Sequence, residues 1–202
     1  IPGGVTSIAS HMCTNCSSLK NVTIPEGVTI IDWQAFENCS SLTKITLPDS
    51  VNTISFAAFR NCSKLTSITI PDSVTHVGEY TFSQCSSIEK VVLGSGITEI
   101  SDRMFTRCSS LTSVEFRGKI TRIGEQAFEW TLSIESFDIP ESVTEIAKNA
   151  FKNSSLQKVI IHKGVKSISI AAFPESVEYN EYGGGLYLGY YDTAGAELLC
   201  LS

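Results

Sequence analysis

Residues 45–65 read ITLPDSVNTISFAAFRNCSKL, and residues 68–88 repeat the pattern as ITIPDSVTHVGEYTFSQCSSI. The two stretches align at a spacing of 23 residues, which holds along most of the chain. Six complete units run from Leu19 to Ser155, a partial unit precedes them, and a seventh begins at Leu156. One column of phenylalanines shows the spacing, with a last step of 22 residues: Phe36, Phe59, Phe82, Phe105, Phe128, Phe151 and Phe173. A period of this length is typical of a solenoid of stacked turns.

Each unit predicts two short strands and one compact turn. In residues 45–47 apolar side chains alternate with Thr46, which is the periodicity of a strand. Pro48 ends that strand because it has no N–H for a ladder. The V-x-x-I segment at 51–54 predicts a second extended piece, and the A-F-x-x-C segment at 58–62 predicts a short helical turn with its aromatic side chain facing inward.

A single unit cannot bury its apolar side, so we expect the units to stack and to pair equivalent strands in parallel. The expected organisation is a leucine-rich-repeat solenoid of 23-residue units over residues 1–178, followed by a C-terminal segment at 179–202. Within that segment, 186–188 and 197–201 have the composition of strands. They predict a β-hairpin-like cap over the end of the core, or a spacer before further repeats.

The motif I-x-[LI]-P-x-x-V-x-x-I followed by A-F-x-x-C-x-x-L resembles the Treponema-pallidum-type leucine-rich repeat, also called the BspA-like repeat, over about residues 5–177. The resemblance implies a right-handed arc with a parallel β-sheet on its concave face and with short strands and helical turns on its convex side. It also implies an extracellular or cell-surface protein of host-associated bacteria or protist parasites. Because the chain begins at Ile1 with neither an initiator Met nor a signal peptide, we expect a fragment of a longer protein.

Charge and composition argue against several functions. The chain has 15 Lys and Arg against 21 Asp and Glu, a net charge of −6, which disfavours a basic nucleic-acid-binding face. Its apolar runs are far shorter than the roughly 18 residues needed to span a membrane. The three histidines fall in different phases of the repeat, and no nucleophile–base pair emerges. We therefore expect no enzyme and no cofactor.

Five cysteines share one column, three residues after the phenylalanine column: Cys16, Cys39, Cys62, Cys85 and Cys108. They could form disulfides or a row of metal ligands, or they could be small buried hydrophobes. We favour buried hydrophobes, because one row of thiols lacks the tetrahedral grouping that zinc requires and adjacent parallel side chains rarely meet disulfide geometry. Cys13 stands in the phenylalanine column, and without a second C-x-x-C its pairing with Cys16 does not predict a metal site.

The outward-facing residues of the longer strand form the first candidate binding surface, because solenoids bind with their sheet face. The candidate residues there are Thr23, Lys44, Thr46, Thr69, Lys90, Glu115 and Asp138. Threonine is also a favourable residue on any solvated strand. A ligand-binding face and an ordinary solvated sheet surface therefore remain open as interpretations.

A second candidate surface is aromatic. Trp33 and Phe56 occupy the same column in adjacent units, and Tyr80 lies one position further along. The same column holds Asp102 and Glu125 in later units, so we expect it to be exposed. Exposed aromatic side chains in contact would form an apolar patch of the kind that marks an interaction site. The alternative is that these side chains pack against a terminal or neighbouring segment.

Two functions remain open for this sequence. The first is a non-enzymatic cell-surface or secreted recognition module that binds a protein or glycan partner, in adhesion or host interaction. The second is a structural stalk or spacer that displays another domain.

Overall fold

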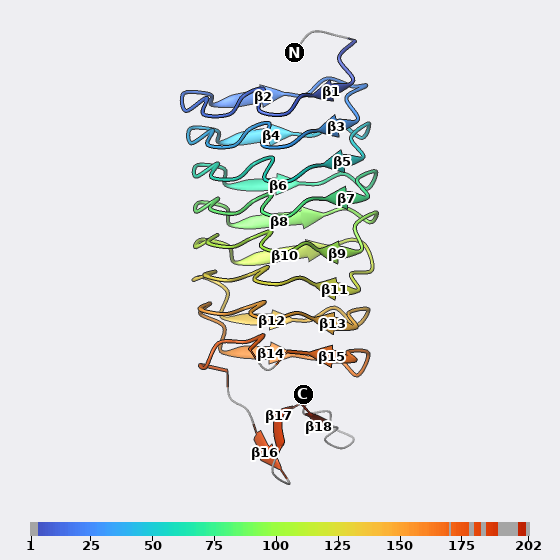
Figure 1. Ribbon diagram of the computed structural model, residues 1–202, viewed down its shortest axis with the longest axis vertical. Helices are drawn as coiled ribbons and strands as arrows, with labels where there is room; N and C mark the ends of the chain where they lie inside the picture. Colours follow the sequence, from blue (N-terminus) through green and yellow to red (C-terminus); the bar gives the residue numbers. More distant parts are fainter. Residues whose placement is uncertain (1–3, 170, 178–179, 183–184, 190–197, 201–202) are drawn as a thin grey trace.

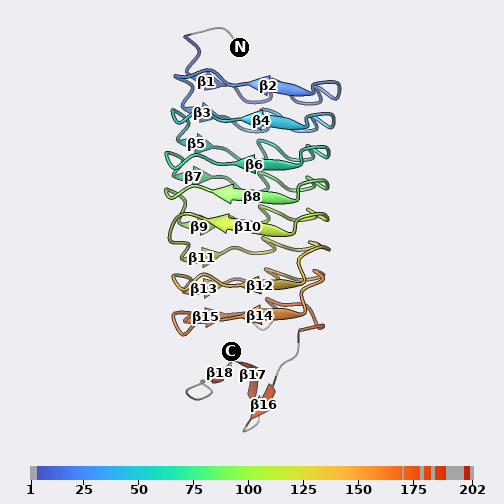
Figure 2. The same ribbon diagram turned by 180° about the vertical axis from the view of Figure 1, so that it is seen from behind.

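The computed structural model describes residues 4–169, 171–177, 180–182, 185–189 and 198–200. The repeat units form successive turns that lie one on another along the long axis of the molecule (Figure 1 and, from behind, Figure 2). Each complete turn contributes one longer strand, one two-residue strand and an irregular outer turn. The predicted parallel β-solenoid is therefore confirmed.

The longer strands lie side by side in one column: β2 (Asn21–Thr23), β4 (Lys44–Thr46), β6 (Ser67–Thr69), β8 (Lys90–Leu93), β10 (Ser113–Phe116), β12 (Ser136–Asp138) and β14 (Lys158–Ile160). Paired strands are parallel and keep the register of the repeat, so that Val22 lies opposite Ile45. The ladder joins β2 to β4, β6 to β8 and β10, and β12 to β14, but it does not join β4 to β6 or β10 to β12.

The two-residue strands form a second column: β1 (Ser7–Ile8), β3 (Ile30–Ile31), β5 (Thr53–Ile54), β7 (His76–Val77), β9 (Glu99–Ile100), β11 (Arg122–Ile123), β13 (Glu145–Ile146) and β15 (Ser167–Ile168). They pair in parallel with the same register, as Ile31 does with Ile54. The predicted second strand-like piece of each unit is thus confirmed. The second residue of each two-residue strand is apolar and points inward, since it is buried in every strand of this column.

The core is a continuous stack that runs through all these turns. Consecutive phenylalanine rings from Phe36 to Phe173 lie with centroids 4.9–5.8 Å apart and planes within 24° of parallel. This separation is typical of stacked aromatic pairs, which add favourable contact energy to the burial of the rings themselves. Isoleucine, valine and leucine columns fill the remainder of the interior. Each turn is therefore stabilised mainly by its two neighbours.

The prediction of helical turns at the outer corner is wrong, and none of the described residues lies in a helix. In the outer turn at residues 55–62, alternate N–H groups bond to carbonyls of the next turn at 2.8–3.0 Å: Ala57 to Glu79, Phe59 to Thr81, and Asn61 to Ser83. The N–H groups between them bond three residues back. An α-helix would bond every N–H four residues back. The positive φ angles of Ala57 and Asn61, 54° and 56°, also exclude a regular helix.

Asparagines in the outer turns form a side-chain ladder. Asn38 Nδ2 donates to Asn15 Oδ1 at 2.7 Å, and Asn61 Nδ2 donates to Asn38 Oδ1 at 2.9 Å. Asn38 also has a φ of 60°, a left-handed conformation that asparagine tolerates better than most residues. The ladder therefore combines a side-chain bond between turns with a backbone position suited to asparagine.

The substitution Asn38→Ala is expected to lower the free energy of unfolding by about 1–2 kcal/mol, because it removes both ladder bonds and places alanine in a left-handed conformation. Chemical denaturation followed by circular dichroism would measure the change. The control is Asn21→Ala, at an exposed position on β2, which should change stability by less than about 0.5 kcal/mol. Equal effects of the two substitutions would show that the ladder contributes nothing.

The C-terminal segment contains three short antiparallel strands: β16 (Asn180–Tyr182), β17 (Gly185–Gly189) and β18 (Leu198–Cys200). Strands β17 and β18 overlap the two segments that we expected to be strands. The role of this segment as a cap or a spacer stays a prediction. Among the described residues, no helix is long and apolar enough to cross a membrane.

Candidate interaction surfaces

The strand face is the outward side of the longer strands, and it carries all seven residues predicted for it. Thr23, Lys44, Thr46, Thr69, Lys90, Glu115 and Asp138 are all exposed there. They are exposed because the residue between two such positions, as in β4, points into the core. Some of the polar groups already have partners: Lys90 Nζ lies 3.1 Å from Glu115 Oε2 in an ion pair, and His162 Nε2 lies within hydrogen-bond distance of Asp138 Oδ1, at 2.8 Å.

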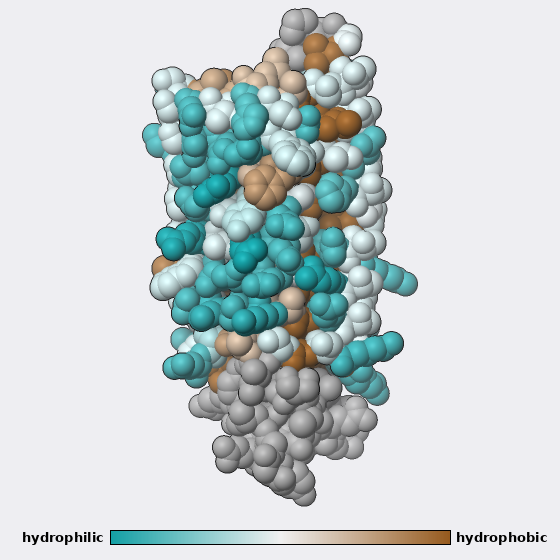
Figure 3. Space-filling view, in the orientation of Figure 1, coloured by the Kyte–Doolittle hydropathy of each residue, from teal (hydrophilic) through white to brown (hydrophobic). Residues whose placement is uncertain are grey.

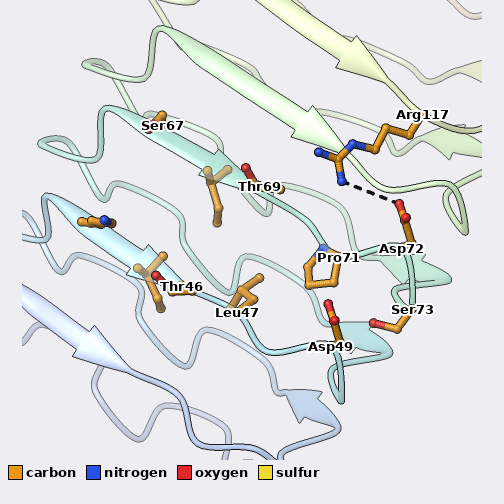
Figure 4. Close-up of a pocket in the computed structure, with 12 residues that line it drawn as sticks. Thr46, Leu47, Asp49, Ser67, Thr69, Pro71, Asp72, Ser73 and Arg117 are labelled. Carbon is orange, nitrogen blue, oxygen red and sulfur yellow. Dashed lines mark ion pairs between the residues drawn. The ribbon is translucent and has the colours of Figure 1, made fainter.

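A hollow of about 530 Å³ lies on this face between β4 and β6, where the strand ladder is interrupted (Figure 4). Lys44, Thr46 and Thr69 line it, as do Asp72 and Arg117. Arg117 reaches from a later turn toward Asp72, and the closest nitrogen and oxygen atoms are 4.0 Å apart. The hollow offers hydroxyl and charged groups to a polar ligand.

The aromatic patch, defined as Trp33, Phe56 and Tyr80, is a continuous cluster. Trp33 and Phe56 have ring centroids 6.3 Å apart, and Phe56 and Tyr80 have centroids 5.4 Å apart, all with tilted planes. Trp33 is 60% exposed, whereas Phe56 and Tyr80 are half-buried. The face shown in Figure 3 is mostly hydrophilic or intermediate in hydropathy. The repeat brings the predicted aromatic residues together.

Two arginines that the sequence did not predict flank this patch. The guanidinium carbons of Arg60 and Arg103 lie 5.8 Å and 5.4 Å from the centroid of the Tyr80 ring, within cation–π range. Arg60 is held by Glu37 at 3.4 Å, and Arg103 by Glu125 at 3.6 Å. The only sequence signal for Arg103 was its place in the Tyr80 column one unit later.

The backbone at the edge of the patch is also fixed. The Trp33 N–H donates to Asp32 Oδ1 at 2.8 Å, and this bond lowers the pKa of the Asp32 carboxyl group. At neutral pH the carboxylate is therefore charged and holds the start of the outer turn in place. The exposed Trp33 side chain projects from a defined backbone position.

Four of the five cysteines in the column are core residues, but the prediction is wrong for Cys16, which is exposed because it lies in the first turn of the described solenoid and no described turn covers its other side. Cys39, Cys62, Cys85 and Cys108 are buried, and each thiol donates to a backbone carbonyl of the preceding turn at 3.0–3.3 Å. Burial raises the pKa of all four thiols, to about 12 for Cys39. Among the described residues, no group of three or more His, Cys, Asp or Glu side chains could hold a metal ion.

Known proteins share this repeat. No curated protein matches the chain. A leucine-rich-repeat protein of Treponema pallidum is 23% identical with a TM-score of 0.51, and the match covers 66% of this chain and 74% of that protein. One from Eubacterium ventriosum is 26% identical with a TM-score of 0.54, over 68% of this chain and 43% of that protein. A leucine-rich cell surface protein of Faecalibacterium prausnitzii is 27% identical with a TM-score of 0.40, over 81% and 59%.

The family model for the BspA-type leucine-rich-repeat region matches residues 6–131 and 53–181, in six copies. These two ranges cover nearly all of the solenoid and include every strand of both columns. The resemblance inferred from the motif is therefore confirmed, and this chain belongs to the BspA-type leucine-rich-repeat family.

Proposed function

We propose that this chain is a non-enzymatic recognition module, on a cell surface or secreted, and that it binds a protein partner through the aromatic patch and its flanking arginines. The observation that carries the proposal is the unbroken contact from exposed Trp33 through Phe56 to Tyr80, with two guanidinium groups beside the last ring. Tryptophan, tyrosine and arginine are the residues most enriched among those that dominate binding energy at protein interfaces.

The restrained side-chain conformations within the patch support a protein partner. The salt bridges of Arg60 and Arg103 favour side-chain positions beside the Tyr80 ring, which reduces the conformational entropy lost on binding. A sugar ring stacks on a free aromatic face, and the Tyr80 ring has less of its face free because two cations lie close to it. We therefore place a protein ahead of a glycan as the partner.

In this proposal the strand face contributes less to the binding energy than the aromatic patch does. Lys90 and Glu115 are already paired with each other, and Asp138 is in hydrogen-bond contact with His162, so a ligand would have to compete with those contacts. Thr23, Thr46, Thr69 and Lys44 then form polar surroundings rather than the centre of the interface. The surface location rests on membership of the BspA-type family.

The proposal predicts that Trp33→Ala combined with Phe56→Ala weakens binding to surface proteins solubilised from cultured epithelial cells by at least about tenfold, because the two truncations remove the centre of the interface. Binding of the labelled chain to the immobilised proteins gives the affinity. The matched control is Trp130→Ala. Trp130 is 42% exposed and has the Arg107 guanidinium 6.0 Å from its ring, but it lies outside the patch.

Enzymatic treatment of the immobilised material identifies the class of partner. Protease treatment should abolish binding, and removal of glycans should leave it intact. The opposite pattern would indicate a glycan partner. If the double variant and the Trp130→Ala control bind as the wild type does, the aromatic patch has no role and a stalk or spacer becomes the better interpretation.

A further inference from the structure

Cys13 and Cys16 occupy the two ends of one closed turn. The Cys16 N–H donates to the Cys13 carbonyl at 3.1 Å, with Asn15 between them at a φ of 63°. The turn is anchored to the next one, because the Cys13 N–H donates to the Ala35 carbonyl and the Asn15 N–H to the Glu37 carbonyl, both at 2.8 Å. Its backbone is therefore held in place independently of the two thiols.

This geometry suits a disulfide. A hydrogen-bonded four-residue turn keeps its end Cα atoms within about 7 Å, and a disulfide requires a Cα separation of roughly 4.4–6.8 Å. Burial raises the pKa of the Cys13 thiol, and the nearby Cys16 thiol raises it further. Cys16 is exposed and Cys13 is half-buried, so a reagent in solution reaches Cys16 first.

The other four cysteines of the column are each in a separate turn, although both Cys13 and Cys16 contribute to the raised pKa of Cys39. The Cys39 thiol donates to the Cys13 carbonyl at 3.2 Å, and Cys62, Cys85 and Cys108 donate to phenylalanine carbonyls in the same way. These four thiols are buried, and neighbours in the column belong to different turns. Thiolates are the reactive form of cysteine, and burial keeps these four thiols protonated more strongly than it does the half-buried Cys13.

We propose that Cys13 and Cys16 form an intramolecular disulfide by exchange with a low-molecular-weight disulfide, while Cys39, Cys62, Cys85 and Cys108 stay reduced. The Cys16 thiolate attacks one sulfur of the reagent, which forms a mixed disulfide and releases one reduced thiol. The Cys13 thiolate then attacks the Cys16 sulfur and releases the second reduced thiol. The chain loses two protons and two electrons, and the reagent is reduced to two thiols.

The bond would fix the first turn of the described solenoid. In this turn Cys13 replaces the phenylalanine that packs between neighbouring rings elsewhere in the column. A covalent link between the ends of the turn restrains the segment that carries the smaller side chain. The modification therefore adds a restraint where the aromatic stack ends.

The test treats the fully reduced, folded chain with oxidised glutathione, then unfolds it in denaturant with an alkylating reagent present, and maps the cysteines by mass spectrometry after proteolysis. All proteins carry Cys200→Ser, so that only the six cysteines from Cys13 to Cys108 are counted. We expect a linked Cys13–Cys16 peptide and four alkylated column cysteines. In Cys13→Ser the glutathione adduct should persist on Cys16, because no resolving thiol is present. In Cys39→Ser the Cys13–Cys16 link should still form.

The result for Cys13 and Cys16 in the protein that carries Cys200→Ser alone does not depend on whether the Cys13→Ser and Cys39→Ser variants fold. A glutathione adduct that persists on Cys16 in the presence of Cys13, a link between Cys16 and Cys39, or the absence of any reaction would each overturn the proposal.

Discussion

Phe82→Ala is expected to lower the free energy of unfolding by about 3–5 kcal/mol. The Phe82 ring is fully buried, and its centroid lies 5.7 Å from that of Phe59 and 5.8 Å from that of Phe105. Truncation therefore leaves a cavity in the middle of the stack and removes two stacked contacts. Because each turn packs mainly on its neighbours, the loss also weakens the connection between the two halves of the solenoid.

The matched control for this substitution is Phe56→Ala, which removes the same side chain from the half-buried aromatic patch. Phe56→Ala should lower the free energy of unfolding by about 1 kcal/mol. Urea denaturation followed by circular dichroism would measure both. Similar values for Phe82→Ala and Phe56→Ala would contradict the assignment of the phenylalanine column as the principal core.

Gly94→Ala is expected to be destabilising by about 3 kcal/mol, although it adds only one methyl group. Gly94 stands in the column that holds Pro48 and Pro71 in earlier units. A Cβ at this position would lie 2.2 Å from the Pro71 carbonyl oxygen, and real Cβ atoms are not found closer than 3.0 Å. The obstructing atom belongs to the backbone of the adjacent turn, so the two turns would have to move apart.

The neighbouring Ser95→Ala serves as the control for Gly94→Ala. Ser95 is exposed, and its backbone N–H bond to Asp72 Oδ1, 2.8 Å long, survives the substitution. Its stability should stay within about 0.5 kcal/mol of the wild type. A thermal unfolding midpoint for Gly94→Ala equal to that of Ser95→Ala would show that the turns accommodate a larger side chain at this point.

The positions of the strands could be predicted from the sequence because the repeat sets them. Alternation around Thr46 and the terminating Pro48 predicted β4 correctly, and the shared columns predicted which residues lie opposite each other. The form of the outer turn could not be predicted in the same way. The spacing of Phe59 and Cys62 fits a helical turn and a chain of β-turns equally well.

Residues with a left-handed backbone conformation (positive φ) distinguish a chain of β-turns from a helical turn. Asparagine at 15, 38 and 61 is a signal for a left-handed conformation, but Gln84 and Arg107 occupy the same column and also have positive φ. The hydrogen bonds between turns impose the conformation there, and these bonds exist only once the turns have stacked. Local residue preference alone therefore could not identify it.

The parts of the candidate site that could be predicted are those whose positions follow directly from the repeat. The common column of Trp33 and Phe56 predicted their contact. Arg60 and Arg117 were missed because the period fixes Cα positions but not the direction of a long side chain. Arg117 reaches back to Asp72, two units earlier, and no spacing rule indicates this contact.

The central claim is that a protein partner covers Trp33, and acrylamide quenching of tryptophan fluorescence tests it directly. The chain has two tryptophans, so Trp130→Phe leaves Trp33 as the only one, and Trp33→Phe leaves Trp130. With the partner captured by the wild-type chain, we expect Trp33 to be protected from quenching and Trp130 to be quenched as in the free protein. Equal quenching of Trp33 in the free and bound states, or protection of Trp130 alone, would contradict the claim.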